Sequence, residues 1–108
     1  MTTRRLGVDG LQRIGRALVD PTRCAILRCL LDGPHYPTEL AQHLGLTKAN
    51  VSNHLACLRG CGLVVGLQEG RRVRYELSDP RLAHALDQLV GLAPVLTAVC
   101  EAEEGRAS

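Results

Sequence analysis

Residues 37–62 read PTELAQHLGLTKANVSNHLACLRGCG, and this stretch decides the fold. Pro37 is typical of the first turn of a helix, where its missing backbone N–H would have no partner anyway. Gly45 suits the left-handed position that ends such a helix, and Thr47 can cap a second helix that begins at once. Two short helices joined by a tight, glycine-containing turn indicate a helix-turn-helix, with a recognition helix over about residues 47–60.

Two further helices are expected before this unit. Apolar residues at helical spacing predict the first over about residues 8–18. Asp20 followed by Pro21 predicts the start of the second, because Asp is a favourable N-cap and Pro fits the first helical turn. Gly33 and Pro34 then end it.

After Gly62 the pattern changes to that of strands. Residues 63–65 and 73–77 are rich in strand-forming residues, and the turn signals around Gly70 join them. The sequence therefore predicts a β-hairpin wing over about residues 63–77, directly after the recognition helix.

Pro80 predicts the start of a last helix, which together with a polar tail covers about residues 80–108. Pro94 is expected to break or kink this helix, because it lacks a backbone N–H and its ring clashes with the preceding turn. The polar tail from Glu101 is expected to fray.

This order of elements predicts a mainly α fold with a small β-hairpin, the winged helix-turn-helix, in one domain over residues 1–108. The chain has no Phe or Trp and only two Tyr, so its core must be aliphatic. A domain of this size buries a limited share of its surface. Because the terminal helices are apolar, we expect a homodimer that pairs through them.

Basic residues concentrate in the middle third of the chain, although the net charge of the whole is only +2. Residues 47–75 contain five basic residues and one acidic residue, whereas residues 76–108 contain two basic and six acidic residues. This asymmetry indicates an anionic partner for the middle third.

The recognition helix has one face for the core and an opposite face suited to DNA. On a helical wheel Val51, Leu55 and Leu58 cluster, whereas the residues opposite are small or polar enough to read a major groove. A small, polar helix face alone could be an ordinary solvated surface, and so could a basic hairpin alone. The two features together, next to a helix-turn-helix, predict binding to double-stranded operator DNA. The candidate contacts are Lys48, Ala49, Asn50, Ser52 and Asn53 on the helix and Arg71, Arg72 and Arg74 on the wing.

The chain has five cysteines, an odd number. It contains neither a secretory signal nor an uninterrupted run of about 18 apolar residues. We therefore expect a soluble, cytoplasmic protein with reduced thiols and no membrane partner. Free thiols in that compartment indicate metal or redox chemistry in place of a disulfide framework.

Cys57 and Cys61 lie four residues apart on the recognition helix, so both thiols can point at one atom. They share a flank with His54, beside the DNA face. Cys100 in the C-terminal segment is the candidate for a third thiolate. Three thiolates suit large soft ions such as Cd(II) or Pb(II) better than Zn(II), which also binds thiolates but prefers four ligands.

Other assignments of these residues stay open at this point. Cys24 and Cys29 are interpreted as packing residues, with Cys24 the better candidate for an exception, and His54 as a structural hydrogen-bonding group. Cys57 and Cys61 could instead sense oxidants through a disulfide, which their helical spacing would strain. A thiol enzyme is the remaining alternative, although the sequence has no Cys-x-x-Cys motif.

The sequence resembles the ArsR/SmtB family of metalloregulators over about residues 10–90. Within that family, residues 57–65 look most like the branch that senses cadmium and lead. The matching runs are DPTR at 20–23, LA at 40–41, LG at 44–45, NVSNHL at 50–55, GLV at 62–64 and GRRVRY at 70–75.

The resemblance implies a homodimeric repressor that binds operator DNA without metal and releases it when metal binds. It also implies that two cysteines of the recognition helix, here Cys57 and Cys61, bind the ion together with one from the tail, for which Cys100 is the candidate. We therefore expect a transcriptional repressor with Cd(II) or Pb(II) as inducer, no catalytic residues and no small organic substrate.

Overall fold

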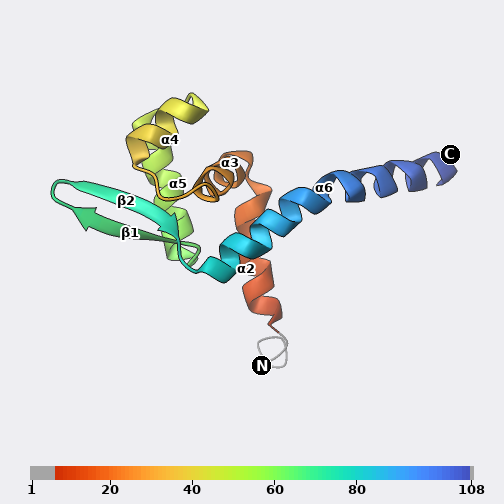
Figure 1. Ribbon diagram of the computed structural model, residues 1–108. Helices are drawn as coiled ribbons and strands as arrows, with labels where there is room; N and C mark the ends of the chain where they lie inside the picture. Colours follow the sequence, from red (N-terminus) through yellow and green to blue (C-terminus); the bar gives the residue numbers. More distant parts are fainter. Residues whose placement is uncertain (1–6, 108) are drawn as a thin grey trace.

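The computed structural model describes residues 7–107 and confirms the winged helix-turn-helix fold (Figure 1). Helices α3, α4 and α5 pack together at the centre, the hairpin projects to one side, and the last helix leads away on the other. The elements are α2 (Val8–Val19), α3 (Pro21–Leu30), α4 (Pro37–Leu44), α5 (Lys48–Gly60), β1 (Val64–Glu69), β2 (Arg72–Leu77) and α6 (Pro80–Ala107).

The boundaries of the helix-turn-helix are set by the local signals that the sequence contains. Gly45 ends α4 in the left-handed conformation, with a φ of 66°. Thr47 caps α5, because its hydroxyl oxygen accepts a hydrogen bond from the backbone N–H of Asn50 at 3.1 Å. These two residues fix the short turn that orients α5 against α4.

Asp20 caps α3 in the same way. Its carboxylate accepts a hydrogen bond from the backbone N–H of Arg23 at 3.0 Å. This bond holds the pKa of the Asp20 carboxyl below its usual value. The cap therefore stabilises the fold above the pKa that Asp20 has in the unfolded chain, and this contribution is lost as the pH falls through the lower, folded pKa.

The core is aliphatic, as predicted. Val51, Leu55 and Leu58 on one face of α5 are completely buried, and α3, α4 and the start of β1 supply most of their surroundings. Replacing one of the two leucines by Ala would cost about 2–5 kcal/mol of folding free energy. The buried apolar residues are Ala17, Ile26, Leu27, Leu30, Leu40, Ala41, Val51, Leu55, Leu58, Leu63, Val64 and Leu86.

The wing is an antiparallel pair in which Val64 lies opposite Leu77 and Glu69 opposite Arg72. Its first strand is longer than the three residues predicted, because pairing with β2 continues to the turn at Gly70. The segment between Val65 and Glu69 has few strong strand formers, so its conformation is set by the partner strand rather than by local propensity.

A backbone bridge ties the wing to the rest of the molecule. The backbone N–H of His35 donates to the carbonyl of Tyr75 at 2.9 Å, and the N–H of Tyr75 donates to the carbonyl of His35 at 2.8 Å. The loop before α4 therefore acts as a short third strand beside β2.

The last helix corrects one expectation. Helix α6 runs without a break from Pro80 to Ala107 and includes Pro94, so the predicted break is wrong, and the tail from Glu101 to Ala107 is helical. The carbonyl of Val90, which loses its helical partner at Pro94, lies in an exposed segment where water can bond it. An ion pair of 3.0 Å between Arg106 and Glu103 adds support in the last turns.

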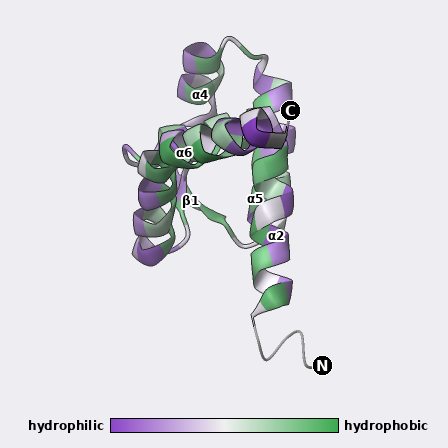
Figure 2. Ribbon diagram, turned by 90° about the vertical axis from the view of Figure 1, so that its right-hand side faces the viewer, coloured by the Kyte–Doolittle hydropathy of each residue, from purple (hydrophilic) through white to green (hydrophobic). Residues whose placement is uncertain are grey.

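Much of the apolar surface of α6 has no cover within the described residues. Leu89, Leu92, Val95, Leu96 and Val99 are each between 43% and 56% exposed, and Figure 2 shows hydrophobic residues along the helix. By length and mean hydropathy, 1.4 over its most apolar window, α6 also reaches the range of a membrane span. The helix nevertheless lacks the uninterrupted run of about 18 apolar residues that is typical of a membrane-spanning helix. This is weak evidence for a membrane, because interface helices of soluble proteins have the same composition.

The Thr47 cap gives a prediction about stability. Thr47→Ala removes the acceptor for the Asn50 N–H, and we expect the free energy of unfolding in urea to fall by about 1 kcal/mol. Thr38→Ala is the matched control, because Thr38 makes no side-chain hydrogen bond in the described part of the chain. An equal loss in both variants would contradict the capping role of Thr47.

Candidate DNA interface and metal site

The predicted DNA face of α5 is open to solvent. Lys48 lies in the first turn, where the helix dipole adds to its positive charge. Ala49, Asn50, Ser52 and Asn53 are all exposed. On the helical wheel Ala49, Ser52 and Asn53 lie away from the buried apolar face, and Asn50 lies on the flank that carries Cys57 and Cys61. The structure thus leaves each of the helix residues proposed from sequence free to meet a partner.

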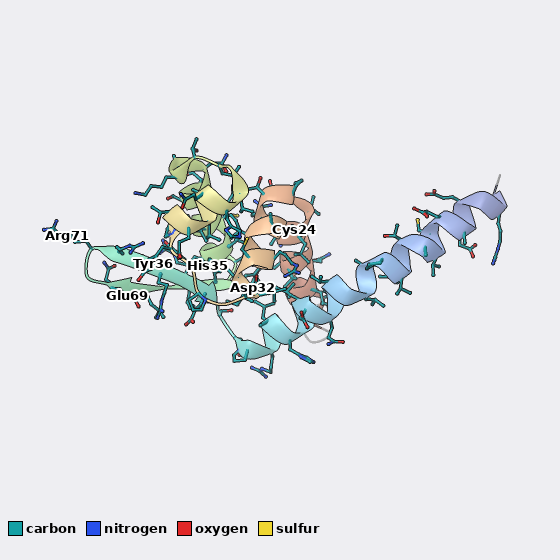
Figure 3. All side chains as sticks on the ribbon, turned by 45° about the horizontal axis from the view of Figure 1, so that its top comes forward. Cys24, Asp32, His35, Tyr36, Glu69 and Arg71 are labelled. Carbon is teal, nitrogen blue, oxygen red and sulfur yellow. The ribbon has the colours of Figure 1, made fainter. Side chains whose placement is uncertain are left out.

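The three wing arginines differ in their surroundings. Arg71 is exposed at the turn of the wing (Figure 3). Arg72 lies over the ring of Tyr36, with its guanidinium carbon 3.5 Å from the ring centre. Arg74 is about two-thirds buried and forms an ion pair with Glu69 at 3.0 Å. Arg71 and Arg72 therefore present their charges outward, whereas the charge of Arg74 has a partner inside the wing.

A cleft of about 290 Å³ lies between the wing and the helix-turn-helix. Lys48, Arg71 and Arg72 bring three positive charges to it, and Ser52 and Thr38 add hydroxyl groups. Side chains of this kind bind backbone phosphates of DNA. The cleft thus joins the exposed face of α5 to the tip of the wing in one basic surface.

Two of the three predicted metal ligands lie together. Cys57 is exposed and Cys61 half-buried, one turn apart at the C-terminal end of α5. Cys100 is exposed on the distal part of α6, where its thiol lies 3.7 Å from Glu104. Within residues 7–107 of one chain, no three His, Cys, Asp or Glu side chains form a group that could hold an ion. A single chain therefore brings together two of the three sulfurs of the predicted site.

Arg23 contacts this pair of thiols at Cys57, and the sequence did not indicate it. Its guanidinium donates to the backbone carbonyls of Arg16 at 3.1 Å and Ala17 at 3.3 Å, in the last turns of α2. It also donates to the sulfur of Cys57 at 3.5 Å. The contact joins residues 34 apart, so no local sequence pattern could have indicated it. Arg23 thus links the end of α2 to the recognition helix.

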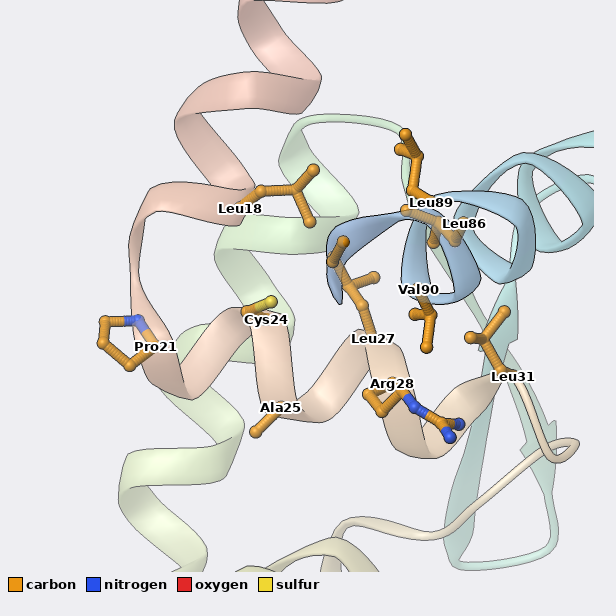
Figure 4. Close-up of a pocket in the computed structure, with 11 residues that line it drawn as sticks. Leu18, Pro21, Cys24, Ala25, Leu27, Arg28, Leu31, Leu86, Leu89 and Val90 are labelled. Carbon is orange, nitrogen blue, oxygen red and sulfur yellow. The ribbon is translucent and has the colours of Figure 1, made fainter. Parts of the chain in front are cut away.

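The remaining thiols and His54 divide into different environments. Cys29 is half-buried against the core, and this burial raises the pKa of its thiol, in keeping with a packing role. Cys24 is exposed, so it is the exception to the packing interpretation of the two cysteines of α3. It lines an apolar pocket of about 570 Å³ between α3 and α6 (Figure 4), on a face of α3 that no described residue covers. His54 is half-buried and contributes to the low pKa of the Asp20 carboxyl.

Comparison with known proteins decides the family. Residues 20–65 match the model of the bacterial regulatory protein, arsR family. CmtR of Mycobacterium tuberculosis, an HTH-type transcriptional regulator, is 63% identical over 90 residues, which is 83% of this chain and 76% of that protein. The chain belongs to the arsR family. This regulator is therefore a CmtR-like DNA-binding transcriptional regulator, which sets aside the alternative of a thiol enzyme.

Other relatives agree with this assignment. A probable mercury resistance operon repressor of Streptomyces lividans is 41% identical over 83% of this chain and 69% of its own length. The NMR structure of the cadmium metal-sensor CMTR of M. tuberculosis matches with a TM-score of 0.66 and 66% identity, over 76% of this chain and 85% of that one. A homodimeric winged helix-turn-helix domain of Mycobacterium bovis matches with a TM-score of 0.79 and 26% identity, over 87% of each chain.

The different thiol environments give a prediction about reactivity. At about pH 8, iodoacetamide should alkylate Cys57 several-fold faster than Cys29 in the native, reduced regulator, because burial restricts access and the raised pKa leaves less thiolate. Peptide mass spectrometry of timed samples measures both rates. In urea the two rates should converge. Equal rates in the native protein would contradict the environment assigned to Cys29.

Proposed function

We propose that this regulator is a cytoplasmic, homodimeric repressor that binds double-stranded operator DNA without metal and releases it on binding Cd(II) or Pb(II). One observation carries the proposal: two free thiols, Cys57 and Cys61, lie one turn apart on the helix whose other face is open to DNA. An ion bound there acts directly on the element that reads the operator. The resemblance to a cadmium sensor supports the choice of ion.

The DNA contacts follow from the basic surface. The small and polar residues Ala49, Asn50, Ser52 and Asn53 on α5 read base edges in the major groove. Lys48, Arg71 and Arg72 bind backbone phosphates around the cleft beside the wing. The affinity then falls steeply with salt, because each neutralised phosphate releases counterions.

The dimer is supported by the uncovered apolar surface of α6. A helix with five large apolar side chains about half exposed is unfavourable in water and is stabilised by pairing with a second copy. The homodimeric state of the M. bovis relative agrees with this arrangement. Two copies of the helix-turn-helix can then bind two half-sites of one operator.

The donor set favours a three-thiolate site completed between subunits. Cys57 and Cys61 supply two sulfurs of suitable chemistry, and α6 carries Cys100 away from the α5 helix of its own chain. In a dimer paired through α6, the distal end of this helix extends toward the other subunit. We therefore assign the third ligand to Cys100 of the partner subunit. A soft ion that accepts three thiolates fits this set better than Zn(II).

Release of DNA follows from what ligation does to α5. Drawing the sulfurs of Cys57 and Cys61 toward one point reshapes the C-terminal end of the helix, which Gly60 and Gly62 already weaken. Ligation also converts the Cys57 thiol into a metal-bound thiolate, so the contact that Arg23 makes with it between α5 and the end of α2 changes as well. Three thiolates around a divalent ion also leave a net negative charge beside the DNA face.

A cadmium titration of the reduced regulator tests this function. Cd(II) binds thiolates as a Lewis acid, and the cadmium–thiolate bonds give an absorption band in the near ultraviolet. We expect wild-type affinity for a duplex selected from a random pool to fall about 5- to 150-fold as the band appears. Cys57→Ser, Cys61→Ser and Cys100→Ser should each lose the band and the release of DNA but keep metal-free DNA binding.

Cys24→Ser is the matched control, because Cys24 is also an exposed thiol but lies on α3. It should behave like the wild type. A wild-type regulator that binds DNA equally well with and without cadmium would contradict metal sensing. Release by peroxide in place of cadmium would favour the redox alternative.

A further inference from the structure

Glu69 is the one acidic residue between positions 47 and 75, in the most basic part of the chain. It lies at the end of β1, beside the turn that carries Arg71 and directly across from Arg72. A carboxylate with no partner at this place would repel DNA phosphates and offset one of the wing charges. Its presence on a DNA-binding wing therefore needs a physical explanation.

Both carboxylate oxygens of Glu69 have partners. One accepts a hydrogen bond from the hydroxyl of Tyr36 at 2.5 Å, and the other forms the 3.0 Å ion pair with Arg74. Arg72 lies over the same Tyr36 ring. Tyr36 is itself held in place, because its backbone N–H donates to the carboxylate of Glu39 at 2.7 Å in the first turn of α4. The cluster thus connects the start of α4 to both strands of the wing (Figure 3).

This cluster attaches the wing near its tip. The base of the wing is held by Val64, which is buried in the core, and by the backbone bridge between His35 and Tyr75. Tyr36 follows His35 directly in the chain, but it contacts Glu69 at the far end of β1, next to the turn. A two-stranded hairpin held only at its base can swing, whereas a further attachment near the tip fixes its direction. The direction of the wing then decides where Arg71 and Arg72 meet the DNA.

We propose that Tyr36 is a positioning residue for DNA binding that acts through Glu69, and that Arg74 is the internal counter-ion of Glu69 and not a phosphate contact. The proposal rests on the proposed DNA-binding function. It assigns a structural role to some residues of the wing and phosphate binding to others. Tyr36, Glu69 and Arg74 hold the hairpin against α4. Arg71 and Arg72 carry the charges that bind phosphate.

The partial burial of Arg74 supports this division. Its side chain is 38% exposed, and its Nε atom is buried without a hydrogen-bond partner in residues 7–107. A guanidinium packed in this way, with one nitrogen on a carboxylate, cannot turn toward a phosphate without leaving that carboxylate unpaired. Arg71 makes no such contact at the tip and has no comparable cost.

A double-mutant cycle tests whether Tyr36 acts through Glu69. Tyr36→Phe removes one hydroxyl and no charge, and we expect DNA binding to weaken about two- to tenfold, the range for one lost hydrogen bond. In a Glu69→Ala background the same substitution should have little effect, because its acceptor is gone. Tyr75→Phe is the matched control, because it removes from the same cleft a hydroxyl that has no hydrogen bond in the described residues, and it should weaken binding less than Tyr36→Phe does.

The dependence of DNA affinity on salt tests the role of Arg74. Arg71→Gln should reduce the slope of log affinity against log salt by about 0.9, the value for one lost phosphate contact. The double variant Arg74→Gln/Glu69→Gln removes a neutral pair and should keep the wild-type slope. Fluorescence anisotropy with the duplex that the wild type selects from a random pool measures both quantities, and urea unfolding of each variant checks that it is folded.

Two results would overturn the proposal. An equal effect of Tyr36→Phe with and without Glu69 would show that Tyr36 does not act through the carboxylate. A drop of about 0.9 in the slope for the Arg74→Gln/Glu69→Gln variant would make Arg74 a phosphate contact. If the wild type selects no duplex, DNA binding itself fails, so this outcome is distinct from failure of the positioning role in a wild type that binds.

Discussion

The complete burial of Val51, Leu55 and Leu58 is the constraint on which the rest of the structure depends. Because a helix has about 3.6 residues per turn, fixing these three side chains in the core also fixes the direction of every other side chain on α5. Ala49, Ser52 and Asn53 then face away from the core. Cys57 and Cys61 fall on the flank between the two faces. One packing interaction thus places DNA reading and thiol chemistry on the same rigid element.

In this arrangement the proposed thiol site and the DNA-reading face lie on the same helix. Many regulators need a chain of contacts from the ligand site to the DNA site, whereas here both use α5. The contact of Arg23 with Cys57 adds a connection to the end of α2, so a change at the thiols is felt by the N-terminal helix as well. The Tyr36 cluster serves a separate need, because it holds the tip of the wing, whereas the core face of α5 packs against the start of β1 at the base of the wing. The recognition helix and the base of the wing therefore share one core, and the tip has its own attachment.

Features that depend on neighbouring residues were predictable from the sequence. The caps at Asp20 and Thr47 and the turn at Gly45 lie where their local chemistry indicates. Local rules failed where the environment overrides them. Pro94 does not break α6, since the helix around it is exposed and the freed carbonyl can bond water. Cys24 is exposed because the face of α3 that carries it has no cover, and periodicity alone does not say which apolar faces find partners.

Contacts between distant parts of the chain were not predictable. Tyr36 and Glu69 are 33 residues apart, and nothing near either one indicates the other. The single signal in the sequence is Glu69, the one acidic residue in a basic segment. It indicates that the carboxylate has a partner but not which residue that partner is. The same holds for the third thiolate, since sequence suggests Cys100 but only the course of α6 points to the partner subunit.

Mixing two inactive variants tests the shared metal site most directly. One chain carries Cys100→Ser, the other Cys57→Ser and Cys61→Ser, and the two are co-refolded and isolated as mixed dimers by different affinity tags. Neither variant alone holds a complete site. A site completed between subunits predicts that the mixed dimer regains the near-ultraviolet cadmium–thiolate band, at about half the wild-type amplitude because one of its two sites is whole. A mixed dimer without the band, beside a wild type that shows it, would contradict a third ligand from the partner subunit.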